Sequence, residues 1–285
     1  MSVGSLREIV LGTPGPDQAA RLDYYTAVMG EDPETGEPDP EALARARLVM
    51  EGFGQVPAVV LRRRLGSLRV AAASRVRAAA GPVMELRRGG GLVEVLERRH
   101  PHAGFFALQE VALTHPRFDG GRSPRLSREV FVVGDAVTVL PYDPVRDRVL
   151  LIEQFRVGPF GRGDPHPWQL EAIAGRIDPG ETPEDAARRE AVEEAGLVLG
   201  RLEKVAEYYP TPGAVTEYLY SYVALCDLPD GVAGVFGAAE EAEDIRGQLL
   251  AFDRLVDVMA TGEIGNAPLL LTVLWLQRER ARLRG

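Results

Sequence analysis

Three glutamates in one short stretch of the chain have the spacing that metal chemistry needs. Glu190, Glu193 and Glu194 stand at positions i, i+3 and i+4, which places their carboxylates on one face of a helix. Like charges this close repel one another, so the arrangement is unfavourable unless a cation lies among them. Mg²⁺ is the natural candidate, because it takes oxygen ligands, uses few carboxylates and keeps waters for a substrate phosphate. The stretch therefore indicates a site for a divalent cation and a phosphate.

The neighbouring residues predict the helix that carries these glutamates. Thr182 is a good N-cap and Pro183 suits the first helical position. Alanines favour the helix interior, and Gly196 is placed to end it. We therefore expect a helix from Thr182 to Ala195. The glycines of the preceding loop, residues 175–180, allow its backbone to approach an ion closely.

An acidic helix face is more often simply solvated, and that alternative has to be weighed. It does not account for the residues that stand at fixed offsets across 175–197, which are Gly175, Glu181, Arg189, Glu190, Glu193, Glu194 and Gly196. These residues match the Nudix box, G-x5-E-x7-R-E-U-x-E-E-x-G-U, in which U is apolar. Such a set recurs by chance at about 10⁻⁸ per window. One position departs from the usual pattern, because Ala191 is smaller than the customary Ile, Leu or Val.

Composition limits the class of protein. The 285 residues are 45% hydrophobic and 26% charged, which is ordinary for a globular protein of one large or two small domains. A net charge of −9 argues against a nucleic-acid partner. The single cysteine, Cys226, excludes an intrachain disulfide and a cysteine-rich zinc site. No apolar stretch is long enough for a membrane span or a signal peptide, so we expect a cytoplasmic protein without a membrane partner.

Residues 1–104 differ in sequence pattern from the rest of the chain. They form a separate N-terminal region whose role the sequence does not indicate. Helices are expected at Asp17–Met29 and Pro40–Phe53. Residues 58–98 are expected to be β-like in part, because arginines alternate there with Val, Leu and Ala. These arginines could contact phosphates, although a solvated face is the commoner role of such a run.

The rest of the chain, 105–285, alternates between strand and helix patterns. Val, Leu, Phe and Thr dominate segments separated by Gly and Pro, and they predict strands at 105–113, 128–133, 136–142, 149–157, 169–174, 201–209, 217–224 and 245–251. Helices are expected at 252–259 and 267–284, besides the helix of the box. The fold class is therefore α/β (α+β), with a smaller α+β region in front.

Residues from about 105 to 282 resemble the ADP-ribose pyrophosphatase branch of the Nudix hydrolases. Beyond the box, the resemblance rests on LPYDPVRDRVLLIEQFRVGP at 140–159, YYPTPGAVTE at 208–217 and EEAEDIR at 240–246. It implies an α/β/α sandwich with a mixed sheet. It also implies hydrolysis of the diphosphate bond of ADP-ribose to AMP and ribose 5-phosphate, with Mg²⁺ as the cofactor or Mn²⁺ in its place.

The resemblance assigns roles to the residues of the box and of the later acidic loop. The ligands implied for the cation are the carboxylates of Glu190, Glu194 and Glu243 and the backbone carbonyl of Ala174. Glu193 would lie between the residues that bind the cation directly and those that support them. Arg189 would hold Glu181 or another carboxylate of the box by a charge-assisted hydrogen bond. Glu241 would be the general base that activates water. Its neighbour Glu240 is chemically identical and remains the alternative.

Five residues are implied as substrate contacts. Phe105 resembles an adenine-stacking aromatic, and Arg128 and Arg156 resemble arginines that bind the nucleotide and its phosphates. Pro212 occupies the place of a proline that lies beyond the box in this branch, and Glu217 resembles a substrate-positioning acid. Because family members often exchange strands between two subunits, the resemblance implies a homodimer in which Arg128 serves the partner's site.

Two other functions remain open on the sequence alone. A Nudix enzyme could act on another nucleotide sugar, such as ADP-glucose or GDP-mannose, which share the diphosphate. The chain could also be a module that senses ADP-ribose without cleaving it. The presence of the box glutamates together with Glu241 and Glu243 argues against the sensor, because a protein that only binds needs no general base.

Overall fold

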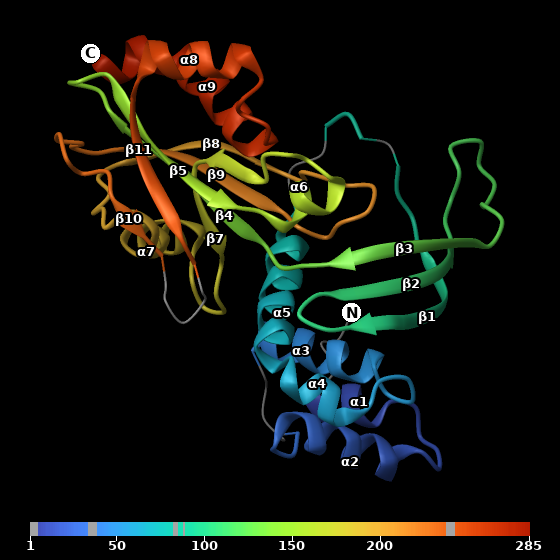
Figure 1. Cartoon of the computed structure of the whole chain (residues 1–285). Coiled ribbons are helices and arrows are strands. Elements are labelled where there is room, and N and C mark those ends of the chain that lie inside the picture. The colour runs from blue at the N-terminus through green and yellow to red at the C-terminus, as the bar shows by residue number, and fades with distance from the viewer. Residues whose placement is uncertain (1–4, 34–38, 82–84, 88, 238–242) are drawn as a thin grey trace. The chain divides into compact units, whose positions relative to one another are not determined.

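The computed structural model of the chain (Figure 1) describes residues 5–33, 39–81, 85–87, 89–237 and 243–285. The chain divides into two compact units. Unit 1 comprises Met1–Asp135 together with Thr211–Glu217, and unit 2 comprises Ala136–Pro210 together with Tyr218–Gly285. The first two strands that we expected in the same domain as the box, at 105–113 and 128–133, lie in unit 1.

Unit 1 begins with a group of helices. They are α1 (Leu6–Leu11), α2 (Gln18–Met29), α3 (Pro40–Glu51), α4 (Ala58–Arg63) and α5 (Leu65–Ala80). The helices expected at 17–29 and 40–53 are confirmed as α2 and α3. Asp39 caps α3 by accepting a hydrogen bond from the N–H of Ala42 at 2.8 Å, with Pro40 in the first turn. The helices share a core that includes Leu6, Val10, Tyr25, Val28, Leu43, Val49, Leu61, Leu68 and Ala72.

The expectation of β structure in residues 58–98 is wrong for most of that range. Residues 58–80 are almost entirely helical, as α4 and α5, and a strand begins only at Glu94. Leu61, Leu68 and Ala72 are buried in the helical core, and their spacing of seven and four residues repeats every two turns and every turn of a helix. The alternation of arginine with Val and Leu resembles the period of a strand, but tertiary packing follows the helical spacing.

Unit 1 continues as a three-stranded antiparallel sheet in the order β1 (Glu94–Ala103), β2 (Ala107–Thr114), β3 (Leu126–Val132). β1 was expected only in part, because residues 94–98 fall within the range expected to be β-like and residues 99–103 do not. A turn at Asp119–Gly121 lies between β2 and β3, with the N–H of Arg117 donating to the carbonyl of Gly121 at 2.8 Å. The later segment 211–217 runs beside β3, because Phe131 N–H donates to Ala214 O at 2.8 Å and Thr216 N–H donates to Phe131 O at 3.1 Å.

Unit 2 is built on one mixed sheet. Its described strands follow the order β10 (Val235–Phe236), β11 (Ile245–Ala251), β5 (Arg148–Phe155), β4 (Ala136–Asp143), β9 (Leu219–Leu225) and β8 (Leu202–Tyr208). β4 and β9 are parallel and the other pairs are antiparallel. The single strand expected at 169–174 is divided into β6 (Trp168–Glu171), which pairs with β5, and β7 (Ile173–Arg176), which pairs with β4.

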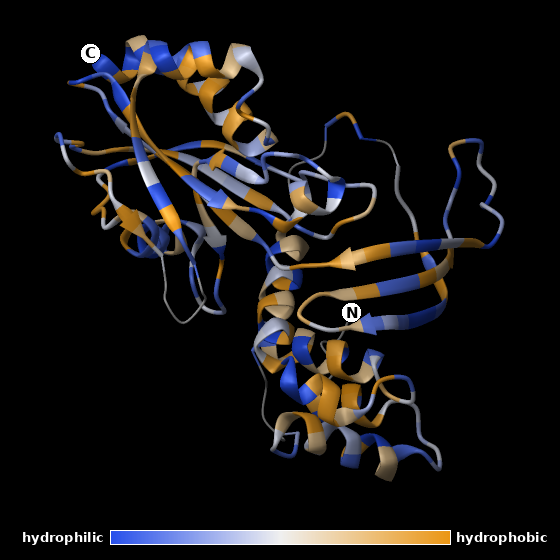
Figure 2. Ribbon diagram, viewed as in Figure 1, coloured by the Kyte–Doolittle hydropathy of each residue, from blue (hydrophilic) through white to orange (hydrophobic). Residues whose placement is uncertain are grey.

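Helices cover both faces of this sheet, so the expected α/β/α sandwich is confirmed. The alanines of α7 (Pro183–Ala195) pack on one face against Val137, Val139, Leu150 and Ile152. α8 (Phe252–Thr261) and α9 (Ala267–Arg284) pack on the other face against Leu140, Tyr142, Val149 and Leu151. Figure 2 shows apolar residues in these strands and in the helices that cover them. A further short helix, α6 (Val157–Arg162), comes after β5 and was not expected.

Within the part of the chain that the structure describes, no helix combines the length and apolar character needed to cross a bilayer.

Candidate active site

Helix α7 forms as its sequence predicts. The Thr182 hydroxyl accepts a hydrogen bond from the N–H of Asp185 at 3.1 Å, and Pro183 occupies the first turn. Gly196 ends the helix in the left-handed conformation, at φ 61°. Four alanines face the core and are buried, namely Ala186, Ala187, Ala191 and Ala195. The small Ala191 therefore fits a face where helix and sheet lie close, and Glu194 is buried on the same face as these alanines.

Arg189 ties the helix to the loop before it. Its Nε and Nη2 donate to the two carboxylate oxygens of Glu181 at 2.8 and 3.1 Å, as the resemblance implies. Its Nη1 donates to Glu190 Oε1 at 2.7 Å and to Glu193 Oε2 at 3.0 Å. The hydrogen bonds from Arg189 lower the pKa of Glu181, and those carboxylates in turn raise the pKa of Arg189. One guanidinium thus compensates part of the repulsion among three acids.

Glu194 and Glu190 are the buried carboxylates of the box. Glu194 is 2% exposed and its Oε2 accepts a hydrogen bond from the N–H of Ala174 at 3.0 Å. Burial raises the pKa of Glu194 to about 8 and that of Glu190 to about 7, and nearby carboxylates, Glu243 among them, add to both shifts. Buried carboxylates with pKa values this high lack sufficient positive charge around them. A cation between them would supply it.

Gly175 allows the backbone of β7 to lie directly against the carboxylate of Glu190. A β-carbon built at position 175 would lie 1.8 Å from Glu190 Oε1, so no larger residue fits while Glu190 keeps its place. The backbone of Ala174, which precedes it, contacts Glu194 through its N–H. The box glycine is therefore required for the close approach of loop backbone and carboxylates.

The donor set in this region fits a hard divalent cation. Among the described residues, no group of three or more His, Cys, Asp or Glu side chains is already arranged to hold a metal. What does lie together is Glu190 and Glu194 on α7, the backbone of Ala174 at Glu194, and Glu243, which is near enough to raise the pKa of both glutamates. Mg²⁺ binds through few carboxylates and keeps water ligands, so this set suits it.

Arg156 and Glu171 form a pair of which the sequence indicated only the arginine. Both Nε and Nη2 of Arg156 donate to Glu171 Oε2, at 2.8 and 2.6 Å. Burial lowers the pKa of Arg156, but Glu171, Glu194 and Glu243 together raise it above its usual value. Arg156 is therefore a cation close to the acidic group. Glu171 was not singled out, although it is the only charged residue in the apolar run 170–174 before Gly175.

The other expected substrate residues belong to unit 1. Phe105 lies in the turn between β1 and β2 and is 70% exposed, with its ring 4.8 Å from that of Phe106. Arg128 lies on β3 and is exposed. Pro212 and Glu217 lie in the segment that runs beside β3. The structure thus groups these four residues in unit 1, and the box, Ala174, Arg156 and Glu243 in unit 2. Glu240 and Glu241 lie outside the described residues.

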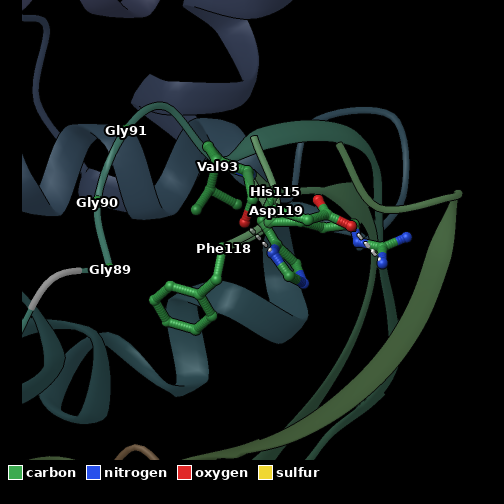
Figure 3. Close-up of a pocket in the computed structure, with 9 residues that line it drawn as sticks. Gly89, Gly90, Gly91, Val93, His115, Phe118 and Asp119 are labelled. Carbon is green, nitrogen blue, oxygen red and sulfur yellow. Dashed lines mark hydrogen bonds and ion pairs between the residues drawn. The ribbon is translucent and has the colours of Figure 1, made fainter. Parts of the chain in front are cut away.

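Two hollows in the surface do not contain the acidic group. One, of about 610 Å³, lies in unit 1 between the glycines 89–91 and the hairpin after β2, where the Phe118 side chain points toward the glycine segment (Figure 3). The other, of about 990 Å³, lies in unit 2, and Glu153, Trp168 and Gln248 are among its lining residues. No residue of the box lines either hollow, so we assign neither a catalytic role.

Comparison with known proteins decides the family. The NUDIX domain model matches residues 133–272. The ADP-ribose pyrophosphatase of Escherichia coli strain K12 is 38% identical over 192 residues, which are 67% of this chain and 91% of that protein. The chain belongs to the Nudix hydrolase family. The residues described above, from Gly175 to Gly196, are thus a Nudix box within a Nudix fold.

Other relatives of this Nudix hydrolase differ in the substrate that they are named for. The ADP-ribose pyrophosphatase of Haemophilus influenzae is 35% identical over 194 residues, covering 67% of this chain and 89% of that one. The GDP-mannose pyrophosphatase of Enterobacter sp. is 32% identical over 185 residues, covering 65% and 95%. A solved structure described as an ADP compounds hydrolase has a TM-score of 0.51 at 22% identity, covering 71% of this chain and all of that one, and it supports the fold.

Proposed function

We propose that this Nudix hydrolase cleaves the diphosphate bond of ADP-ribose in a Mg²⁺-dependent reaction, giving AMP and ribose 5-phosphate. The observation that carries the proposal is the pair of buried carboxylates, Glu190 and Glu194, held against the backbone of 174–175 with Arg156 close by. This arrangement suits a cation and the phosphates bound to it. The identity to ADP-ribose pyrophosphatases over most of their length favours ADP-ribose as the substrate.

The residues of unit 2 would share the binding of the cation and the support of its ligands. Glu190, Glu194 and Glu243, with the carbonyl of Ala174, would hold Mg²⁺, which when bound neutralises the diphosphate and stabilises the leaving phosphate. Arg189 keeps the loop and helix of the box together through its hydrogen bonds to Glu181 and Glu190. Glu193 is the most exposed of the three spaced glutamates Glu190, Glu193 and Glu194, with 45% of its side chain accessible, and lies at the edge of this group.

Arg156 supplies a cation for a phosphate oxygen. Glu171 fixes its guanidinium with two hydrogen bonds to a single oxygen, and we propose that Nη1 of Arg156 binds the substrate. A positioned arginine binds a phosphate in one geometry and so contributes to orientation as well as to charge.

The water that attacks phosphorus must lose a proton, and we propose Glu241 as the base that takes it. The box carboxylates are poorly suited because carboxylates that hold a cation have a lowered proton affinity. The water oxygen forms the new P–O bond, the bridging P–O bond breaks, and the displaced phosphate oxygen leaves with its electron pair. Glu240 is the rival for the same role.

Recognition of the nucleoside is assigned to unit 1. We propose that Phe105 stacks on adenine and that Arg128, Pro212 and Glu217 complete the binding site. We further propose a homodimer with exchanged strands, in which Arg128 acts on the partner's substrate. Light scattering at micromolar concentration tests this, because a monomer mass with full activity would contradict the exchange.

A second candidate substrate is GDP-mannose, because a relative named for it is 32% identical over nearly its whole length. A hydrolysis screen decides between them. The purified chain is incubated with ADP-ribose, ADP-glucose or GDP-mannose and Mg²⁺, and release of AMP or GMP is measured. The proposal expects the highest kcat/KM for ADP-ribose and no turnover with EDTA. Tight binding of ADP-ribose without product would instead indicate a sensor.

A further inference from the structure

The hairpin that presents Phe105 contains an irregularity close to its tip. β1 and β2 pair with Arg99 opposite Glu110 and with His102 opposite Leu108. Two residues of β1, His100 and Pro101, therefore stand against the single residue Gln109 of β2. A bulge of this kind bends a strand and changes the direction of the residues beyond it. The orientation of the tip, Gly104–Phe106, thus depends on the contacts that hold the bulge.

His100 connects the bulge to the helices of unit 1. Gln109 Nε2 lies 3.0 Å from His100 Nε2, and His100 Nδ1 lies 3.5 Å from Oε1 of Gln55, in the loop after α3. A neutral ring with its proton on Nδ1 fits both contacts, since Gln109 then donates to Nε2 and Nδ1–H donates to Gln55. Burial lowers the pKa of His100, which favours that neutral form. Gln109 itself is 8% exposed.

Glu51 makes a second connection just before the bulge. It is the last residue of α3, and its two oxygens accept hydrogen bonds from Arg75 on α5 at 2.9 and 3.0 Å. The same carboxylate forms an ion pair with Arg98 of β1. Its side chain is 19% exposed; burial raises the pKa of Glu51, but the two arginines outweigh it and hold the value below its usual range. One carboxylate therefore joins two helices to the strand.

A third contact lies just beyond the bulge. Ala103, the last residue of β1, packs against the apolar core of the helices. The helices thus contact β1 before, at and after its bulge, through Arg98, His100 and Ala103. The NUDIX family match begins only at residue 133, so both the helices and this hairpin precede it.

We propose that α1–α5 support the β1–β2 hairpin and fix the direction in which Phe105 meets the substrate base, with Glu51 and His100 as positioning residues. The proposal rests on the proposed function, because it concerns how the chain presents Phe105 to a nucleotide. It gives the helices of unit 1 a part in substrate recognition, although none of their side chains needs to touch the substrate.

The first variant is Glu51→Gln, which keeps the size of the side chain and removes its charge. We expect the KM for ADP-ribose to rise by about 5-fold or more while kcat stays within about 2-fold. The control is Glu110→Gln, which removes a carboxylate from the same hairpin. Glu110 pairs with Arg99 and Ser127 on neighbouring strands, so its loss should leave KM unchanged. Equal effects of the two variants would contradict the support role.

A double-mutant cycle with Phe105→Ala separates positioning from general loss of structure. If Glu51 acts through Phe105, the KM of Phe105→Ala is raised already and Glu51→Gln adds nothing to it. Additive effects on KM would overturn the proposal. His100→Gln is carried through the same cycle, so a failure of Glu51→Gln to fold does not end the test. Wild-type turnover of ADP-ribose is measured first, and its absence contradicts the proposed function. Normal wild-type turnover, together with an unchanged KM in Glu51→Gln and His100→Gln, contradicts the support role alone.

Discussion

Gly175 and Glu190 lie so close together that position 175 has no room for a side chain. A β-carbon there would stand 1.8 Å from Glu190 Oε1, far inside van der Waals contact. The same carboxylate oxygen accepts a hydrogen bond from Arg189 at 2.7 Å. The glycine that begins the box therefore fixes how closely the loop backbone and an acid of α7 approach one another.

Gly175→Ala should accordingly push Glu190 out of place. We expect kcat to fall by roughly 10²-fold or more and the Mg²⁺ concentration for half-maximal activity to rise, because a ligand oxygen has moved. Gly161→Ala is the matched control, since a β-carbon there meets nothing within 4 Å. Comparison of Mg²⁺ titrations of the two variants checks this. Normal cation dependence in Gly175→Ala would contradict the assigned place of Glu190.

Glu171→Gln should release Arg156 from its fixed orientation. The pair is joined by hydrogen bonds of 2.8 and 2.6 Å, and loss of a charge-assisted bond is expected to lower kcat/KM by about 10-fold or more. Glu153→Gln serves as the control on the adjoining strand, because Glu153 pairs with Gln248 and Arg246 instead. Steady-state kinetics with ADP-ribose measures both. Similar losses in the two variants would show that the effect is not specific to Arg156.

Glu241→Gln should lower kcat by roughly 10²–10⁴-fold, with substrate and Mg²⁺ binding little changed, because a general base acts in the chemical step. Glu240→Gln should do much less. If Glu240→Gln lowers kcat more than Glu241→Gln does, Glu240 is the base, and the acidic loop still supplies it. If neither substitution matters, the base lies elsewhere and the proposed mechanism fails at its proton transfer.

The stability of unit 1 should depend on pH through His100. Burial lowers its pKa, opposed by Glu51 and assisted by Arg98, Arg64 and Arg75, so the folded chain binds fewer protons at this ring than the unfolded chain does. Stability from this group is complete above the unfolded value of about 6.5 and is lost as pH falls toward the lower folded value. The Tm of the wild type should drop more between about pH 7.5 and about pH 5.5 than that of His100→Gln. An equal change of Tm with pH in the wild type and in His100→Gln would contradict the assignment of this pH dependence to His100.

The helix of the box could be predicted in full because its determinants are local. Thr182, Pro183 and Gly196 mark its ends within one stretch of sequence, and the structure places α7 between them. The central strands of unit 2 were predictable for a similar reason, since their apolar runs are continuous. The sandwich was inferred from the resemblance and from no single residue.

Features that depend on distant partners could not be read from the sequence. β1 is rich in charge, and Arg98 pairs with Glu51 of α3, which is distant in the sequence. The pairing of Arg156 with Glu171 requires β5 and β6 to be neighbours, with Ile152 opposite Glu171. In α5 arginines alternate with apolar residues as in a strand, but the residues that become buried have the spacing of a helix. The segment is helical because those residues pack among the other helices.

The central claim is that Glu194 helps to hold the cation on which hydrolysis depends. The most direct measurement is AMP release from ADP-ribose across a Mg²⁺ titration, with the wild type and Glu194→Gln side by side and Tm recorded for both. We expect the wild type to saturate with Mg²⁺ and to lose all activity with EDTA. Glu194→Gln should keep its fold and lose most turnover at every Mg²⁺ concentration, because a metal ligand is gone. Full turnover by Glu194→Gln at modest Mg²⁺ would contradict the account.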